Sequence, residues 1–415
     1  MTLERSLTLA AQASLALVFL AFPMSVALAN VGLLLMLAFW LPTLAWPGAR
    51  SRLREAMRNP LAVCAVALFA WILLASAWSP AQDRDILGFW QKYLKFLMVP
   101  VFIALMHDEA VRRRCWQGFA LALLITLTIS WLDVFLDFPW TRGHRMGLAS
   151  DHTVFKDYIS QGLMMTLFTT ICAFTVVTSA SRVKQAMAMA LWVLAAISIV
   201  ALSHGRTGYL TLTAATVVFG LTFVASRSRM QAWSIGAGLL VLILMTWWLS
   251  PVLHERLANA WTDAMAALAQ SGLGNVTSAG ARVEMIKLAL SAAGEAPFFG
   301  QGTAAYPVLA SKYFSTVEWC SVTCPHPHNQ FLFFLVEQGL IGLSLFLAYL
   351  AVIGRTALRQ PPAHKAFTLA FVAVAVVAAS THSAFWLSTE SHCLILMSAL
   401  IMAGLRARRT AGAPT

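Results

Sequence analysis

Long apolar runs separated by short polar segments make up most of this chain. A membrane-spanning helix needs about 20 mostly apolar residues, and runs of that length recur through the 415 residues. The pattern predicts an all-α integral membrane protein with about twelve transmembrane helices. We place the spans at 6–24, 26–46, 60–79, 87–106, 116–136, 158–180, 185–202, 208–225, 232–250, 329–353, 366–382 and 385–405.

The placement of Lys and Arg predicts the orientation of these spans. Segments at alternate ends of the spans are rich in basic residues and poor in acids. Cytoplasmic connections carry such an excess, so we expect both termini in the cytoplasm and, in a bacterium, an inner-membrane protein whose other face is periplasmic. The basic residues concerned are Arg5, Arg50, Arg52, Arg54, Arg58, Arg112, Arg113, Arg114, Arg182, Lys184, Arg227, Arg229, Arg355, Arg359, Lys365, Arg406, Arg408 and Arg409.

The composition agrees with a membrane protein. Residues are 59% hydrophobic and only 11% charged, whereas soluble domains carry about 25% charged residues. The net charge of +12 would suit nucleic acid, but most of the basic residues lie in the cytoplasmic segments. We therefore expect contacts with membrane lipids and no nucleic-acid partner.

One long connection stands out on the periplasmic side. It covers 251–328, between the ninth and tenth spans, and we expect short amphipathic helices in it. It divides the chain into nine spans (1–250), the large loop (251–328), and three spans with a cytoplasmic tail (329–415). Long loops in compact proteins usually carry function.

Two arginines on this side are candidate anion ligands, because a guanidinium stays charged and suits phosphate. Arg206 lies at the mouth of the eighth span, flanked by Gly205 and Gly208, which would let backbone approach a ligand. The alternative is an arginine that reaches to lipid headgroups. Arg282 lies near the start of an expected amphipathic surface helix, 278–289; the alternative is a pair with Glu284 or a solvated side chain.

The segment CPHPHNQ, 324–330, ends the long loop. Asn329 is a suitable cap for the tenth span, which would put His328 at the entrance of that span. We predict a catalytic or ligand role for His328 and a supporting role for His326. Glu337 lies inside the span, as a buried polar contact or a supporting residue. Because the periplasm is oxidising, a disulfide between Cys320 and Cys324 is expected to hold the histidines.

Other polar groups share this side of the membrane. Arg142, Arg145 and Lys156 form a basic loop that would hold acidic or phosphorylated sugars, or is simply solvated. The pair Asp83 and Asp85 resembles a metal-binding D-x-D, a short pattern that matches often by chance. Gly300 and Gly302 predict a tight turn around the candidate site.

These groups suit a substrate with an apolar tail, a diphosphate at the membrane surface and a transferable sugar. Arginines would neutralise the diphosphate leaving group. A histidine, which titrates near neutral pH, would accept the proton of an acceptor hydroxyl. No nucleotide cofactor is needed, because the diphosphate bond supplies the driving force. A transporter for such lipids would place its charges near the middle of the bilayer, often within repeats.

Three segments resemble the bacterial O-antigen ligase family, within the wider group of O-antigen ligases and polymerases. They are ALSHGRTGYL, ARVEMIKLAL followed by APFFGQGTAAY, and HPHNQFLFFLVEQGLIGL. In that group an arginine outside a span, a second arginine before a P-x-F/L-G-x-G turn, and an H-N at the next span recur in this order. The expected spans and the large late loop also match.

The resemblance implies a GT-C type, inverting, metal-independent glycosyltransferase without cofactors. Its donor would be undecaprenyl-diphosphate-linked O-antigen and its acceptor the lipid A–core oligosaccharide, in the periplasm. Arg206 and Arg282 would hold the diphosphate, His328 would activate the acceptor, and Asp83 and Asp85 would be structural. A polymerase with the same donor is the alternative; the single late loop and the basic loop at 140–158 favour the ligase.

Overall fold

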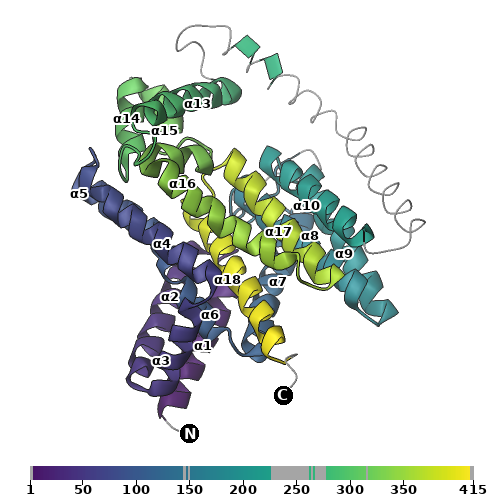
Figure 1. Ribbon diagram of the computed structural model, residues 1–415. Helices are drawn as coiled ribbons and strands as arrows, with labels where there is room; N and C mark the ends of the chain where they lie inside the picture. Colours follow the sequence, from purple (N-terminus) through teal and green to yellow (C-terminus); the bar gives the residue numbers. More distant parts are fainter. Residues whose placement is uncertain are drawn as a thin grey trace.

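The computed structural model describes residues 3–143, 146–147, 150–225, 261–262, 265–266, 277–314 and 316–411. These residues form helices and loops, with no strand among them (Figure 1). Ten helical segments in this part of the chain are long and apolar enough to cross a membrane. The prediction of an all-helical, multi-pass membrane protein is confirmed.

The helices follow the predicted spans closely. The predicted ninth span, 232–250, lies outside the described residues. The spanning helices are α1 (Leu3–Ala21), α2 (Val26–Trp40), α4 (Pro60–Ala75), α5 (Asp83–Leu97) with α6 (Val99–Leu105), α7 (Glu109–Leu132), α8 (Tyr158–Thr178), α9 (Arg182–Ala201), α10 (Arg206–Val224), α16 (Gln330–Ala357) and α17 (Pro362–Thr381); α18 (Ser388–Ala411) follows the predicted twelfth span.

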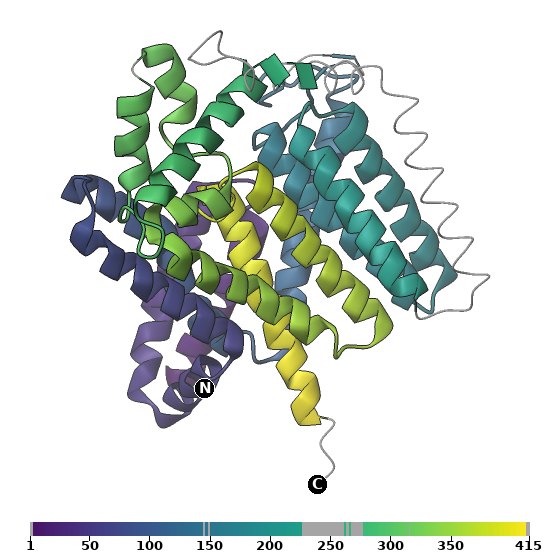
Figure 2. The ribbon, with the colours of Figure 1, turned by 45° about the horizontal axis from the view of Figure 1, so that its top comes forward.

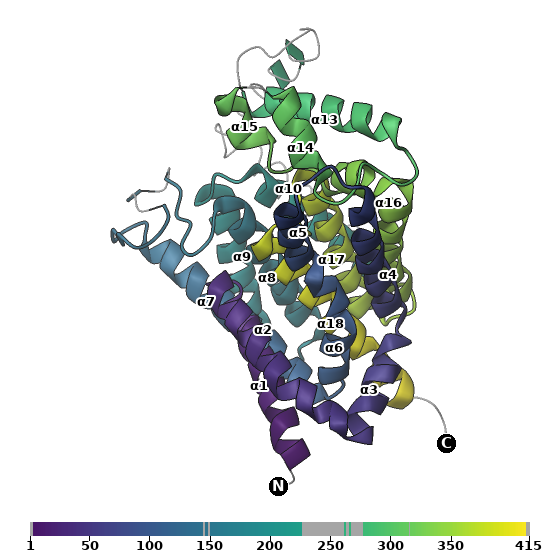
Figure 3. The same ribbon diagram turned by 90° about the vertical axis from the view of Figure 1, so that its left-hand side faces the viewer.

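The bundle has two chemically different ends. The first turn of α1 and the last turn of α18 lie at one end, together with α3 (Pro47–Met57), which carries Arg50, Arg52 and Arg54 (Figures 1 and 3). Three shorter helices, α13 (Ser278–Glu295), α14 (Ala305–Tyr313) and α15 (Val317–Thr323), cover the opposite end (Figure 3). We call this opposite end the α13–α15 end.

Close helix packing explains two of the glycines singled out in the sequence. Helix α10 packs against α8 and α17, and Figure 2 shows these helices side by side. A side chain at Gly208 would begin 3.4 Å from the Cα atom of Gly162 on α8, and one at Gly205 would begin 2.8 Å from the Tyr158 carbonyl oxygen. In this structure Gly205 and Gly208 have a packing role: they let α10 approach α8.

Helix α13 packs against protein along one face. Ala281, Met285, Leu288 and Ala289 are buried, whereas Ile286 is 40% exposed and Leu290 is 55% exposed. The buried positions recur every three or four residues, the spacing of one helical face. The helix contacts α14, α15 and α16. Because Glu284 is buried while Ile286 and Leu290 are exposed, apolar and polar residues are not cleanly divided between its faces.

Helix α16 is broken at Gly339, where the backbone has φ +64° and ψ −165°. The loop 297–302 fills the break. Leu340 and Ile341 donate backbone hydrogen bonds to the carbonyls of Pro297 and Phe298, while Gln301 donates to Val336. A break inside a spanning helix frees backbone groups that need partners away from water, and this loop supplies them.

The loop 297–302 also holds the α13–α15 end to α4. Gly300 and Gly302 have φ values of +75° and +99°. A side chain at Gly300 would begin 2.5 Å from the backbone of Glu337, and one at Gly302 would begin 2.5 Å from Ser79. Trp78 donates its indole N–H to the Gly300 carbonyl. The predicted turn is present, but it surrounds the break in α16 and not the candidate site.

We expect Gly339→Ala to lower the melting temperature of the detergent-solubilised protein by several degrees. The added Cβ would begin 2.3 Å from the Phe298 carbonyl oxygen, and a side chain at this positive φ costs about 1–3 kcal/mol. Gly354→Ala is the matched control, because it lies in the same helix with no neighbouring atom within 4 Å. Equal melting temperatures for both variants would show that the break contributes nothing to stability.

Candidate active site

The segment 324–330 joins α15 to α16 at the α13–α15 end. Asn329 caps α16: its side chain accepts a hydrogen bond from the Leu332 N–H at 3.0 Å and donates one to the Ser380 carbonyl at 3.1 Å. His328 has a positive φ of +49°, a conformation that histidine adopts more often than most residues. The cap and the turn aim the His328 ring toward the end of α17.

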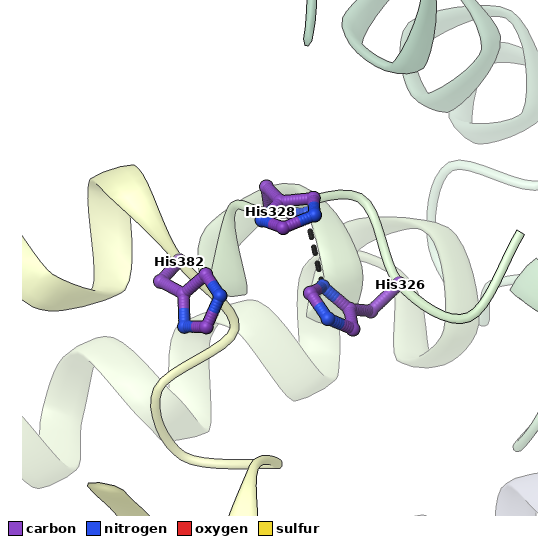
Figure 4. Close-up of side chains that lie close together, drawn as sticks. All are labelled: His326, His328 and His382. Atoms are coloured by element: carbon purple, nitrogen blue, oxygen red, sulfur yellow. Dashed lines mark hydrogen bonds between the residues drawn. The ribbon is translucent and has the colours of Figure 1, made fainter. Parts of the chain in front are cut away.

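Three imidazole rings meet there, from His326, His328 and His382 (Figure 4). The ring of His328 lies 4.3 Å from that of His326 and 5.0 Å from that of His382, measured between centroids. The backbone N–H of His328 donates to Nδ1 of His326 at 3.3 Å. His382 follows the last residue of α17, so the cluster joins two connections far apart in the chain.

His326 and His382 are buried and His328 is partly exposed, and their lowered pKa values keep all three rings neutral at physiological pH. Burial lowers the pKa of His328 to about 4, with a further contribution from the positive charge of Arg282; a hydrogen bond to the Val322 backbone acts in the opposite direction. Burial also lowers the pKa of His326 to about 2 and that of His382 to about 3. A neutral imidazole keeps a lone pair that can accept a proton.

The two predicted arginines, Arg206 and Arg282, lie at the same end of the protein as the histidine cluster. Arg206 is the first residue of α10 and Arg282 lies in the second turn of α13. Burial lowers the pKa of Arg282, and the charge of Arg206 lowers it further. The positive charge of Arg206 therefore acts on Arg282, and the positive charge of Arg282 acts on His328. Glu284, the expected alternative partner of Arg282, instead binds Lys287 at 2.7 Å and the Tyr313 hydroxyl at 2.9 Å.

Part of the predicted basic loop is buried against the rest of the protein. His152 and Asp133 form a fully buried pair at 3.0 Å, and His152 also contacts the Gly147 carbonyl. Lys156 is 8% exposed; burial lowers its pKa, and so does the charge of Arg142. Arg142 and Lys156 therefore lie near one another. Arg145 lies outside the described residues.

Glu337 lies next to the break in α16, and the two outer cysteines lie just before the histidines in the chain. Glu337 is fully buried and accepts the Tyr306 backbone N–H at 3.4 Å, so it caps the start of α14. Cys320 and Cys324 form a disulfide at the end of α15. Asp83 is the first residue of α5, where Asp83 and Asp85 add negative charge to the first helical turn.

Two residues that the sequence interpretation missed also line this place. Lys92 on α5 lies with its Nζ 3.0 Å from the ring centroid of Trp386, and the ring of Trp386 lies 5.3 Å from that of His326. His382 is the other. A lysine within a predicted span is itself a functional signal, and His382 lies on the same side of the membrane as His328 in the predicted topology.

The three imidazoles have the spacing of a loose metal site, since one nitrogen from each lies within 4.8 Å of the others. Their surroundings favour an anion. Nδ1 of His326 already accepts the His328 N–H, so its remaining nitrogen carries the proton and offers no lone pair. Arg282 and Lys92 bring positive charge beside the rings, which disfavours a cation.

Residues 190–347 match a protein-family model described as O-antigen ligase. The matched stretch runs from α9 into α16 and contains Arg206, Arg282, His326 and His328. A search of curated proteins finds no match. Residues 190–347 of this multi-pass helical chain are therefore similar to the O-antigen ligase family.

Proposed function

We propose that this protein is an O-antigen ligase: it transfers O-antigen polysaccharide from undecaprenyl diphosphate to the lipid A–core oligosaccharide. The reaction takes place at the periplasmic face of the inner membrane, which we identify with the α13–α15 end. One observation carries the proposal. A partly buried, neutral His328 lies within electrostatic range of Arg282, which in turn lies within range of Arg206, in the stretch that matches the O-antigen ligase family.

Arg206 and Arg282 hold the donor diphosphate in this proposal. The leaving group is a lipid diphosphate, whose developing charge needs fixed positive groups more than a proton. Arg206 opens α10, and Tyr158, which opens α8, lies against Gly205 beside it. Helix N-termini attract anions, so the start of α10, which has no side-chain cap, supports the arginines, whereas the amides that open α8 are bonded to Asp157. Lys92, whose charge also reaches His326, adds a third cation on the α5 side.

His328 accepts the proton of the acceptor hydroxyl. As the O–H bond breaks, the hydroxyl oxygen attacks the anomeric carbon of the donor sugar. The bond between that carbon and the diphosphate oxygen breaks at the same time, and its electron pair leaves with the diphosphate. Attack opposite to the leaving group inverts the anomeric configuration. The step needs no metal ion, because arginines neutralise the leaving group.

The choice of acceptor separates the ligase from a polymerase with the same donor. The matched family is described as O-antigen ligase. Arg142 and Lys156, near one another on the loop beside α8, suit the phosphorylated sugars of a lipid A–core. These two observations support the ligase.

A transfer assay with purified protein, undecaprenyl-diphosphate O-antigen and lipid A–core, in the presence of EDTA, tests the proposal. We expect O-antigen-capped lipid A–core as the product. A donor glycan that is only lengthened on its own lipid would identify a polymerase. Loss of transfer in EDTA, with recovery on adding Zn²⁺, would mean that the histidine cluster binds a metal.

A further inference from the structure

A buried carboxyl group, that of Glu390, lies next to the histidine cluster and has no role in the proposed reaction. Glu390, in the first turn of α18, is 4% exposed. Its Oε1 atom lies 3.7 Å from Nδ1 of His382 and 2.8 Å from the Ser160 hydroxyl. The same hydroxyl lies 2.8 Å from Oδ2 of Asp157. Because a hydroxyl has a single proton to donate, Asp157, Ser160 and Glu390 form one hydrogen-bonded group in which the two carboxyl groups share a proton.

Two nitrogens in the cluster have no hydrogen-bond partner among the described residues. Nδ1 of His328 and Nδ1 of His382 are both buried and unpaired. A buried nitrogen without a partner is costly and uncommon. Because Nδ1 of His328 is shut in, we assign contact with the acceptor hydroxyl to Nε2, where the acceptor would replace the Val322 backbone bond. Protonation of Nε2 then leaves Nδ1–H as a buried donor that needs an acceptor.

His382 is placed to be that acceptor. One nitrogen of each ring lies within 4.8 Å of the others, and two hydrogen bonds of about 2.8 Å through one water span about 4.6 Å. With the proton of His382 on Nδ1, directed at Glu390, its Nε2 offers a lone pair to the cluster. The proposed chain of contacts then runs from the acceptor hydroxyl through His328 and His382 to Glu390.

We propose that His382 and Glu390 are positioning residues for His328: His382 accepts a hydrogen bond from Nδ1–H of His328, and the Glu390 carboxyl group, 3.7 Å from Nδ1 of His382, pairs with it electrostatically. The inference rests on the proposed function of His328. The pair orients the base and stabilises the imidazolium that forms during transfer, as a carboxylate behind a histidine does in hydrolases. No proton leaves the cluster in this step; it stays on His328.

The charges around the cluster explain why His328 needs such a pair to stabilise its imidazolium. Arg282 on α13 and Lys92 on α5 both oppose a positive charge on the cluster. Asp157, at the start of α8, favours the charged form of His382. Lys156 lies near Asp157 and Glu390. Without Glu390 and Asp157, the charges named here near a protonated His328 would all be positive. Its imidazolium would then be poorly stabilised, and His328 would be a weak base.

The test compares His382→Gln, Glu390→Gln and the double variant with His392→Gln. His392 is a buried histidine on the same helix as Glu390, but its ring contacts Asn30 at 3.0 Å and the Ser388 carbonyl, away from the cluster. We expect each of the first two to lower kcat about tenfold to a hundredfold with KM for both substrates unchanged. The double variant should be no slower than the slower single variant. His392→Gln should keep its kcat.

A pH profile separates positioning from structural support. Glu390→Gln should move the acid limb of kcat to lower pH, because the imidazolium of His328 loses its carboxylate. Wild-type kcat for both single variants, additive losses, or a rise in KM alone would overturn the inference. If His382→Gln does not fold, Glu390→Gln carries the same test. His328→Ala, assayed in parallel, isolates the proposed function: full activity there rejects the base itself, whereas an inactive His328→Ala beside an active His382→Gln rejects only this inference.

Discussion

His328→Ala is expected to reduce glycan transfer about 10²- to 10⁴-fold, the usual contribution of a positioned general base. The substitution removes the imidazole that we propose as the base, whose pKa is lowered to about 4 by burial and by the charge of Arg282. Donor binding should persist, because the proposed diphosphate ligands remain. The measurement is kcat in the transfer assay, with binding of undecaprenyl diphosphate to the same variant followed separately.

His364→Ala is the control. This histidine lies at the start of α17, the end far from the cluster, with its ring 4.8 Å from that of Phe174. It should keep wild-type activity. Transfer by His328→Ala at the wild-type rate would remove His328 from the mechanism.

The pH dependence of the wild-type protein follows from the same environment. The pKa of His328 is lowered to about 4, below the ordinary value near 6.5, so the ring stays neutral until the pH falls toward that value. Transfer at low substrate concentration should therefore be level from about pH 7.5 to pH 5 and decline as His328 becomes protonated around pH 4. An acid limb near pH 6.5 would contradict the burial of this ring.

Most of the fold could be predicted from the sequence, because a span needs little more than length and apolar character. The apolar run 329–353 nevertheless predicts one continuous helix, whereas α16 is broken at Gly339. Gly339 is tolerated in an apolar run, and nothing local distinguishes it from Gly354. Its positive φ depends on the loop 297–302, whose backbone bonds to the break. That pairing is a tertiary contact, which periodicity cannot reveal.

The candidate site divides in the same way. Arg206, Arg282 and His328 could be selected from their side of the membrane and from their motifs, since each is polar at the mouth of a span. His382 and Lys92 lie within or at the edge of apolar runs, and their importance comes from which residues they face. Glu390 and His392 lie two residues apart on α18, yet they contact different partners, Ser160 and Asn30. Helix rotation decides such pairs, and the sequence alone leaves it open.

Replacing either arginine of the proposed diphosphate site should cost nearly as much as losing the base. We expect Arg206→Met and Arg282→Met each to lower kcat/KM about 10²- to 10³-fold, the range seen when one preorganised charge-stabilising donor is removed. Lysine at either position should restore part of the loss, because it keeps the charge but not the planar fork. Weaker binding of undecaprenyl diphosphate, measured directly, should accompany both methionine variants.

Arg282 has a second expected effect that Arg206 does not share directly. Its charge lowers the pKa of His328, so Arg282→Met should move the acid limb of the residual activity to higher pH. Lys287→Met is the matched control on the same helix, since Lys287 binds Glu284 at 2.7 Å, and it should leave donor binding and the pH profile unchanged. If Arg282→Met bound undecaprenyl diphosphate as tightly as the wild type and kept the same acid limb, Arg282 would be neither a diphosphate ligand nor a neighbour of the base.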